Sequence, residues 1–422
     1  MIKPNEYEER RQCLLDKLED DSLLLLFSGV AKKKSYDEDY PFEVNRNFYY
    51  LTGIDQEDSV LLLVKSEGER RQYLFVSPFD ETKEKWYGKR LTTEEAYLLS
   101  GIRNVLLNNS LNARLKAALS PKEAIFGQIK HVYLDKDGEQ KLAEKLDIDG
   151  EMDLLEDLYD ISSVIDVYPL IVKQRLVKSP AEIEELREAI SSTRLGIQAV
   201  MAAAHPGIYE YELASTFLKA CDDDDGYQGL AFNTIMAGGA NATTLHYPCP
   251  KSRVEKGSLI LMDLGARKNY YCADVSRTIP VSGVYSPEQR MLYEIVLGCN
   301  KAVASYARPG ISLGELNEFA KNYLACECLS KGIIARKEDI SRYYFHSVSH
   351  QIGLDTHDPG GDKTSPLEEG NVISDEPGLY IKEKGIGIRI EDDLLITSKG
   401  AEVLTKDIIK EISDIEQFYK RR

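Results

Sequence analysis

Two aspartates stand inside an apolar segment, LILMDLGARKNYYCADVSRT, which spans residues 259–278. The residues before Asp263 predict a buried strand, residues 265–269 predict a turn, and Asp274 falls in the returning strand. The two carboxylates would then face each other across a hairpin. Burial of two like charges is costly unless a cation neutralises them. The segment therefore restricts the chain to folds that bring compensating groups to these two aspartates.

Histidine is scarce in the chain and is concentrated in a different segment. Of six histidines, three (His346, His350 and His357) lie in the sequence HSVSHQIGLDTHD. The spacing of the first two matches a zincin helix, but that motif needs glutamate directly after the first histidine, and Ser347 stands there. The residues around them also disfavour a helix. We therefore expect an irregular segment that supplies nitrogen ligands.

Two glutamates complete the candidate set. Glu376 lies in SDEPGLY, where proline and glycine fix the chain after an extended run, and the sequence GIGIRIEDD alternates. A period of two places Arg389 and Glu391 on one face of that strand and the isoleucines on the other. One nitrogen and several carboxylates suit Mn²⁺, Co²⁺, Fe²⁺ or Zn²⁺ in a two-metal site better than a structural zinc, which favours thiolates. Each feature alone is also common in proteins without a metal.

The length of 422 residues exceeds one ordinary core and predicts two domains. We expect a domain of residues 1–170 with mixed α/β structure and a domain of residues 171–422 in which helices alternate with strands. Between them, Ser179-Pro180-Ala181-Glu182 forms a capping box that begins a long helix. The helix-ending sequence His205-Pro206-Gly207 closes it.

The periodicity of the sequence predicts the remaining elements. We expect helices at 7–18, 92–119, 138–160, 211–221, 287–306 and 314–331, and strands at 23–27, 60–64, 72–76, 258–263, 270–280, 371–381 and 386–397.

Charge and composition exclude several classes of partner. The net charge of −17 argues against nucleic acid and anionic membranes, which would repel the chain. No apolar segment has the length of a signal peptide or a membrane span. The seven scattered cysteines are read as reduced thiols, which predicts a cytoplasmic protein. The acidic run at 222–225 is read as a solvated loop, because consecutive carboxylates cannot all face one cation.

The ordered set of ligand candidates resembles the pita-bread metallopeptidases, the family of methionine aminopeptidase, prolidase and aminopeptidase P. The segments VNRNFYYLTGI (44–54) and WYGKRL (86–91) are similar to the N-terminal domain of aminopeptidase P and prolidase. The resemblance implies an α/β protein. Its C-terminal pita-bread domain would contain antiparallel sheet and helices in two pseudo-symmetric halves, and the N-terminal domain would be smaller.

The resemblance also implies which residues hold metal. Asp274 and Glu391 would bridge two divalent ions, His350 and Glu376 would complete one of them, and Asp263 would bind the other. We expect Mn²⁺, with Co²⁺, Zn²⁺ or Fe²⁺ as alternatives.

Five further residues match pocket positions of the family. His246 and His357 would contact the substrate or its tetrahedral intermediate, and His346 would lie at the pocket edge. Arg389 would lie near the C-terminal side of the peptide, and Tyr380 near the pocket. The alternatives are hydrogen-bonded structural histidines, a salt bridge from Arg389 to the metal glutamate, and core packing of Tyr380.

The expected activity is removal of the residue before proline from the N-terminus of peptides by a hydroxide held between the two ions, with Glu376 as general base and His357 and His246 as catalytic donors. The partners would be proline-containing peptides and further copies of the chain, as a homodimer or homotetramer. Alternatives are a prolidase, a non-catalytic peptide-binding relative, and metal-free hydrolysis like that of creatinase. Ser349, before the metal histidine, favours aminopeptidase P, because prolidase tends to have glycine there.

Cys272 replaces a frequent glycine, which predicts either a small core residue or a thiol near the metals that makes the enzyme sensitive to oxidation.

Overall fold

The computed structural model describes residues 2–135, 142, 159, 161–224 and 227–422. These residues form two compact units, Ile2–Gln174 and Arg175–Arg422. The helix expected at 138–160 lies almost entirely outside the described residues.

The first unit is built on one six-stranded mixed sheet with the strand order β4-β3-β2-β1-β5-β6. Its elements are α1 (Pro4–Lys17), β1 (Ser22–Phe27), α2 (Arg46–Thr52), β2 (Val60–Ser66), β3 (Glu69–Val76), α3 (Glu81–Tyr87), α4 (Thr93–Ser100), β4 (Asn104–Leu107), α5 (Leu111–Leu119), β5 (His131–Leu134), β6 (Ser163–Asp166) and most of α8 (Tyr168–Leu176), whose last two residues belong to the second unit. The antiparallel pairs β1–β2 and β2–β3 form a meander, whereas β4, β5 and β6 join in parallel.

The local sequence explains most of this unit. The predicted strand at 23–27 is buried along its whole length in the centre of the sheet. The predicted hairpin forms because Glu67 and Gly68 both adopt positive φ, the backbone of a tight turn between twisted strands. The helical structure expected at 92–119 is confirmed for α4 and α5 and is wrong between them: Gly101, with φ 73°, ends α4, and residues 104–107 then join the edge of the sheet. Pairing with β3 overrides the helical preference of this segment.

The second unit contains the ligand candidates. Its elements are α9 (Pro180–Ala203), α10 (Glu210–Asp222), β7 (Ile235–Gly238), β8 (Leu259–Leu264), β9 (Arg267–Lys268), β10 (Tyr271–Cys272), β11 (Val275–Pro280), α11 (Pro287–Tyr306), α12 (Leu313–Ser330), β12 (Val372–Asp375), β13 (Gly378–Ile381), β14 (Ile386–Arg389), β15 (Asp392–Thr397), β16 (Gly400–Val403) and α13 (Ile412–Arg421). The capping box predicted for Ser179 and Glu182 is confirmed at the start of α9.

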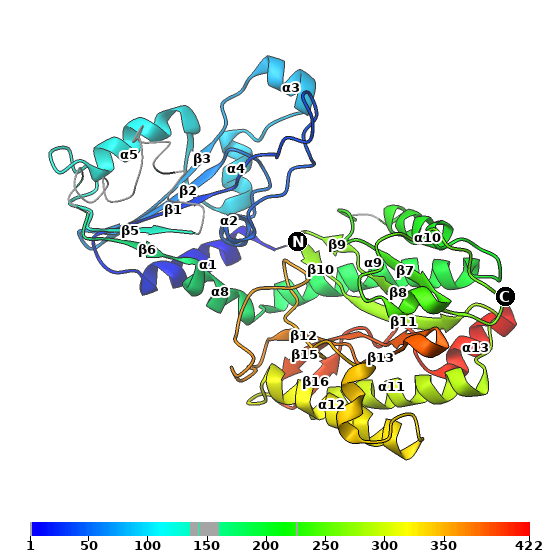
Figure 1. Ribbon diagram of the computed structural model, residues 1–422. Coiled ribbons are helices and arrows are strands. Elements are labelled where there is room, and N and C mark those ends of the chain that lie inside the picture. Colours follow the sequence, from blue (N-terminus) through cyan, green and yellow to red (C-terminus); the bar gives the residue numbers. More distant parts are fainter. Residues whose placement is uncertain (1, 136–141, 143–158, 160, 225–226) are drawn as a thin grey trace. The chain divides into compact units, whose positions relative to one another are not determined.

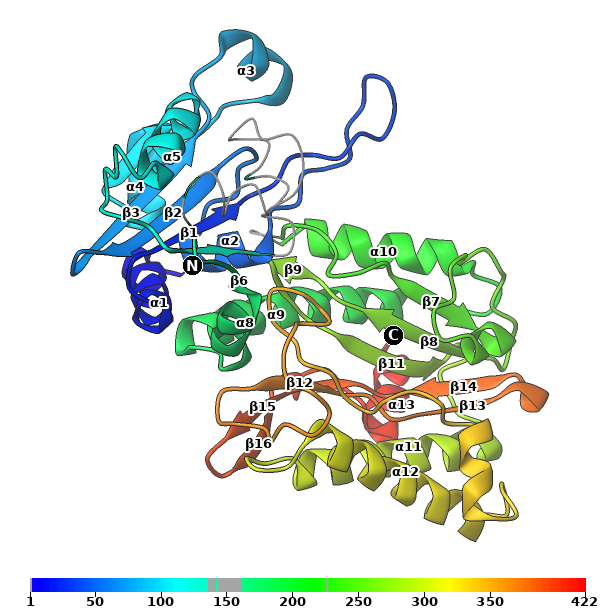
Figure 2. The ribbon, with the colours of Figure 1, turned by 60° about the vertical axis from the view of Figure 1, so that its left-hand side comes forward.

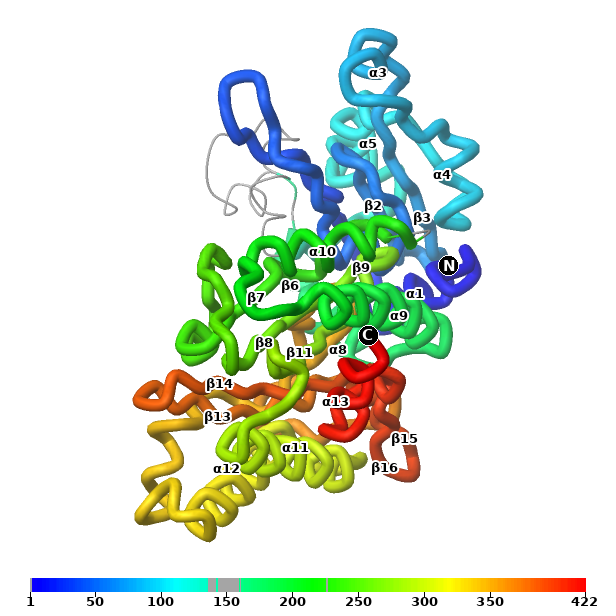
Figure 3. The backbone as a smooth tube through the Cα atoms, turned by 90° about the vertical axis from the view of Figure 1, so that its right-hand side faces the viewer, coloured from blue at the N-terminus to red at the C-terminus, as the bar shows by residue number. Residues whose placement is uncertain are grey.

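Two similar halves make up this unit, as the resemblance implied. One half has the antiparallel sheet β11-β8-β7 with α9 and α10, and the other has the antiparallel sheet β12-β15-β16 with α11 and α12. Figure 1 and Figure 2 show the two helix pairs on the outer sides of the layer of strands. Figure 3 shows the same order of layers from a third direction. The inner strands of both halves therefore face a shared interior.

The two long strands expected near the C-terminus are each interrupted. The run 371–381 divides at Glu376-Pro377 into β12 and β13, and the run 386–397 divides after Arg389 into β14 and β15. Proline has no amide hydrogen to donate to a ladder. Each break leaves one of the candidate glutamates between two strands, so that its side chain is directed by loop geometry rather than by the alternation of one strand.

Candidate active site

The predicted hairpin carries the first two carboxylates. β8 and β11 are antiparallel, with Asp263 opposite Ser276, and Asp274 directly precedes β11. The chain reverses through β9 and β10, with positive φ at Asn269 and Tyr270. The backbones approach closely, since a Cβ atom added at Gly265 would lie 2.0 Å from the carbonyl oxygen of Ala273. Asp274 is 4% exposed and Asp263 9% exposed, so the buried pair predicted from the sequence exists.

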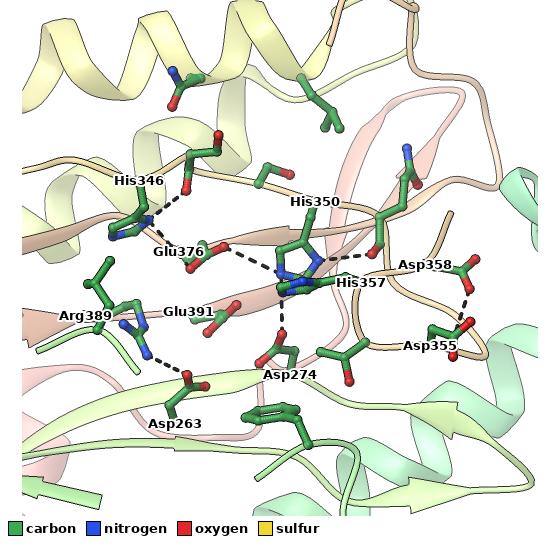
Figure 4. A pocket seen from close by; sticks show the side chains of 18 of the residues that line it. Asp263, Asp274, His346, His350, Asp355, His357, Asp358, Glu376, Arg389 and Glu391 are labelled. Atoms are coloured by element: carbon green, nitrogen blue, oxygen red, sulfur yellow. Dashed lines mark hydrogen bonds and ion pairs between the residues drawn. The ribbon is translucent and has the colours of Figure 1, made fainter. Parts of the chain in front are cut away.

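The two glutamates reach the same place from the other half of the unit. The backbone amide of Glu376 donates to the carbonyl of Val348, and the amide of Glu391 donates to the carbonyl of Ser276. The second bond ties β14–β15 directly to the hairpin. Figure 4 shows the carboxylates of Asp263, Asp274, Glu376 and Glu391 directed at a common space beside the His350 ring.

The His350 imidazole is oriented for ligation. Its Nδ1 lies 3.0 Å from the carbonyl oxygen of Gln351, which only accepts, so Nδ1 carries the hydrogen. The lone pair is then on Nε2, which lies 3.4 Å from Asp274 Oδ2 and 3.6 Å from Glu376 Oε1. The backbone of His350 is held by Ser374, through both its amide and its hydroxyl. A hydrogen bond from the ring nitrogen that does not bind the metal, here Nδ1, fixes the tautomer of a metal-binding histidine.

The carboxylates repel one another strongly. Burial, together with the charge of Asp263, raises the pKa of Glu391 to about 7. Burial and the charge of Glu391 raise the pKa of Asp274 and the pKa of Glu376 well above their usual ranges. The described residues around them offer few compensating cations. The cluster therefore has the electrostatics of a site that a bound cation completes.

The donor set fits divalent metal ions. Three overlapping groups bring ligand atoms within 4.8 Å of one another: Asp263, Asp274 and Glu391; His350, Glu376 and Glu391; and Asp274, His350 and His357. Asp263 Oδ1 is buried and accepts no hydrogen bond from the described residues. Hard oxygen donors with one imidazole suit Mn²⁺, Fe²⁺, Co²⁺ or Zn²⁺. All five predicted ligands thus meet in one cluster, and Glu391 belongs to two of the groups.

Arg389 neutralises part of the negative charge of the carboxylate cluster. Its Nη2 donates to Asp263 Oδ2 at 2.5 Å, and its Nε donates to Ser276 Oγ at 2.7 Å. The Ser276 hydroxyl in turn donates to Glu391 Oε2 at 2.7 Å. Arg389 therefore does not form the salt bridge with Glu391 that the sequence suggested. The two side chains are connected through the Ser276 hydroxyl. Sequence reasoning missed Ser276, although its position two residues after Asp274 on an extended strand was a signal that it shares the same face.

Tyr380 and His346 extend the hydrogen-bonded chain. Arg389 Nη1 donates to Tyr380 Oη at 3.1 Å, and the tyrosine oxygen lies 2.9 Å from His346 Nε2. His346 Nδ1 is 2.8 Å from the carbonyl of Ser347, so Nε2 accepts from the tyrosine hydroxyl. Burial and the charge of Arg389 lower the pKa of His346 to about 4. Tyr380 is 2% exposed, within a small apolar cluster.

The cluster opens into a cavity of about 1680 Å³. Its wall includes the metal-ligand candidates, His246, His346, His357 and Arg389. His357 packs on His350 with ring centroids 4.2 Å apart. Burial and the two neighbouring histidines, His350 and His246, lower the pKa of His357, which favours the neutral ring. The remaining wall carries Leu245, Tyr247 and Pro248 beside His246, so an apolar group can lie next to the cluster.

Two residues that are close in sequence to the candidate ligands, Asp375 and Cys272, direct their side chains to other partners. Asp375 Oδ2 accepts from Asn300 of α11 at 3.2 Å. The Cys272 thiol faces the backbone carbonyls of Tyr270 and Leu354, at 3.4 and 3.8 Å.

Comparison with known proteins agrees with this geometry. Residues 184–398 match the model of metallopeptidase family M24, and residues 7–126 match that of the aminopeptidase P N-terminal domain. A Xaa-Pro aminopeptidase of Haemophilus influenzae is 34% identical, over 98% of this chain and 97% of the relative. Two solved structures of Escherichia coli aminopeptidase P, one zinc-substituted with product and one with the inhibitor Pro-Leu, are 30% identical. Each covers 100% of this chain and 99% of its own, with TM-scores of 0.91 and 0.90.

Proposed function

The chain belongs to metallopeptidase family M24, and on that premise we propose that it is a Xaa-Pro aminopeptidase, which releases the residue before proline from the N-terminus of peptides. The family and fold predicted from the sequence are confirmed. The observation that carries the proposal is the convergence of Asp263, Asp274, His350, Glu376 and Glu391 on one cavity.

These five residues are proposed to hold two divalent ions, with Mn²⁺ as the physiological metal. Bound there, the ions supply Lewis-acid polarisation of the scissile carbonyl and activation of water at neutral pH. They also supply the positive charge that the cluster lacks. With that charge present, the carboxylates ionise at neutral pH in spite of their burial.

Glu376 is proposed as the proton carrier of the reaction. Its carboxylate is within 3.6 Å of His350 and lines the cavity, so it can accept a proton from the attacking water. It can then deliver that proton to the proline nitrogen, a secondary amine that must be protonated to leave. The Glu376→Gln variant would retain the shape of the side chain and lose this function.

His357 and His246 are proposed to stabilise the oxyanion and to bind the substrate. Both line the cavity, and the lowered pKa of His357 keeps it a neutral donor at neutral pH. Preorganised donors of this kind contribute about 3–4 kcal/mol each to transition-state stabilisation. His346, Arg389 and Tyr380 are proposed to shape the side of the pocket that faces the C-terminal part of the peptide.

The preference for proline is proposed to come from the apolar wall beside His246. A proline nitrogen carries no hydrogen for a hydrogen bond, so its pocket needs shape rather than an acceptor. Leu245 and Tyr247 provide such a surface.

The test is hydrolysis of a panel of short X-Pro peptides after chelation and after Mn²⁺ is returned. We expect no cleavage in chelator, recovery with Mn²⁺, and little cleavage of matched X-Ala peptides. Absence of bindable metal, or equal cleavage of both panels, would reject the proposal. A prolidase is the alternative, and cleavage of Ala-Pro but not Ala-Pro-Ala would identify it.

A homodimer or homotetramer in the cytoplasm is proposed as the working form. None of the seven cysteines, all of them among the described residues, forms a disulfide, which fits a reducing compartment. Within the described residues, the structure contains no helix of the length and apolar character that a membrane crossing requires. Light scattering coupled to size exclusion would decide the oligomeric state.

A further inference from the structure

His357 faces the cavity without a hydrogen bond of its own. No described residue pairs with either ring nitrogen, and its ring contact is with His350. A group that stabilises charge in a transition state must be fixed before the reaction. Because no hydrogen bond from the described residues holds the ring, the position of the imidazole depends on its packing against His350 and on the backbone at residues 357 and 358.

That backbone is fixed by the next residue, Asp358. The Asp358 amide donates to the carbonyl of Gln351 at 2.9 Å, which closes a loop of residues 351–358. The Asp358 carboxylate turns back into this loop and accepts from the amide of Asp355 at 3.2 Å. Gly353 makes room for it, since a Cβ atom at that position would lie 2.5 Å from Asp358 Oδ2. The loop is thus folded around one carboxylate.

Two cations from a distant segment clamp this carboxylate. Arg175 Nη2 lies 2.6 Å from Asp358 Oδ1, and Lys178 Nζ lies 3.2 Å from Oδ2. The three side chains are 4%, 1% and 1% exposed. Arg175 also pairs with Asp355 at 2.8 Å. Burial opposes ionisation of Asp358, but the charges of Lys178 and Arg175 outweigh it and keep the pKa below its usual value.

We propose that Asp358, clamped by Arg175 and Lys178, is a positioning residue that sets the orientation of His357 over the metal-ligand cluster. Arg175 is the first residue of the second unit, so the clamp anchors the start of this unit to the loop that carries His357. This inference rests on the proposed function only in the kinetic tests, because these measure catalysis.

The kinetic test is a double-mutant cycle in the Mn²⁺-loaded full chain. Asp358→Asn removes the charge with little change of shape, and we expect it to lower kcat for Ala-Pro-Ala by about a hundredfold, the cost of a small misplacement of a catalytic group. If Asp358 acts through His357, the same change in a His357→Ala background lowers kcat by less than about threefold. Equal losses in both backgrounds would overturn the proposal, because a general structural defect acts in both.

Two further variants separate positioning from loss of folding. Gly353→Ala keeps every charge and displaces the carboxylate, so it should lower kcat while metal content, measured by mass spectrometry, stays at the parental level. Arg11→Met is the matched control: Arg11 is a fully buried arginine of the other unit, hydrogen-bonded to Leu51 and Ser100 carbonyls, and its loss should lower Tm without changing kcat. A Gly353→Ala enzyme with parental kcat would contradict the proposal.

A spectroscopic arm does not depend on peptidase activity. The chain has six histidines, so ¹⁵N-histidine labelling of the zinc-loaded protein gives few imidazole signals, and the one lost in His357→Ala is that of His357. In Asp358→Asn we expect this signal to move while those of His131 and His205 stay in place. An unmoved His357 signal would refute the positioning role. If the parent fails to cleave X-Pro peptides but the signal moves, the proposed function fails and the clamp stands.

Discussion

We expect Glu391 to destabilise the metal-free protein at neutral pH, and its replacement by glutamine tests this directly. The carboxyl is 2% exposed, and burial and Asp263 raise its pKa to about 7 from a usual value of 4.5. The folded state therefore holds this proton more tightly than the unfolded chain. The resulting stability is fully present below pH 4.5 and is lost as pH rises through about 7.

The size of the effect follows from the difference between the usual pKa of Glu391 and its raised pKa in the folded protein. Each tenfold change in proton affinity is worth about 1.36 kcal/mol, so Glu391 alone accounts for roughly 3 kcal/mol, most of it between about pH 5 and pH 8. Glutamine keeps the oxygen that accepts from Ser276 and does not ionise. Its presence also relieves the repulsion that raises the pKa of Asp274 and that of Glu376.

Urea unfolding of parent and Glu391→Gln in chelator, at pH 5 and pH 8, measures the difference. We expect similar stability at pH 5 and a gain for the variant at pH 8 of roughly 3 kcal/mol, or about 5–10 °C in Tm for a unit of this size. Added Mn²⁺ should reverse the order at pH 8, because only the parent keeps all five carboxylate and imidazole side chains proposed to hold the metal. If the free energy of unfolding of the parent and that of the variant change equally with pH in chelator, the electrostatic account of the cluster is refuted.

Further substitutions test individual contacts. Asp274→Asn should lower kcat/KM for Ala-Pro-Ala by at least about 10²–10³ and reduce bound metal, both measurable on one preparation; full activity would exclude it as a ligand. Ser347→Ala should leave kcat/KM within about twofold, since it removes a hydroxyl with no role in the cluster. Gly387→Ala should destabilise the protein by about 1–3 kcal/mol in urea, because its Cβ would lie 2.0 Å from the Ala242 carbonyl oxygen; unchanged unfolding would show that the strand can shift. Cys272→Ala should be as sensitive to peroxide as the parent if this thiol is a core residue, and more resistant if it reacts near the metals.

Local patterns were enough to predict the parts of the chain that carry the chemistry. The β8–β11 hairpin, the capped start of α9 and the helix at 287–306 follow from periodicity, turn residues and caps, which act over a few neighbours. The ligand set itself came from residue type and order. The segment 92–119 was misjudged because a strand at a sheet edge is stabilised by a neighbour that is distant in sequence.

The sequence by itself determined the family, the hairpin that buries two carboxylates and the five candidate ligand residues, because these depend on residue identity and on short-range backbone preferences. Only the tertiary structure decided that Arg389 pairs with Asp263, that Ser276 supports Glu391, and that Arg175 and Lys178 hold the loop of His357. A buried charge pairs with groups that are close to it in space. The sequence does not show that Arg175 and Asp358 are close, because they are far apart along the chain.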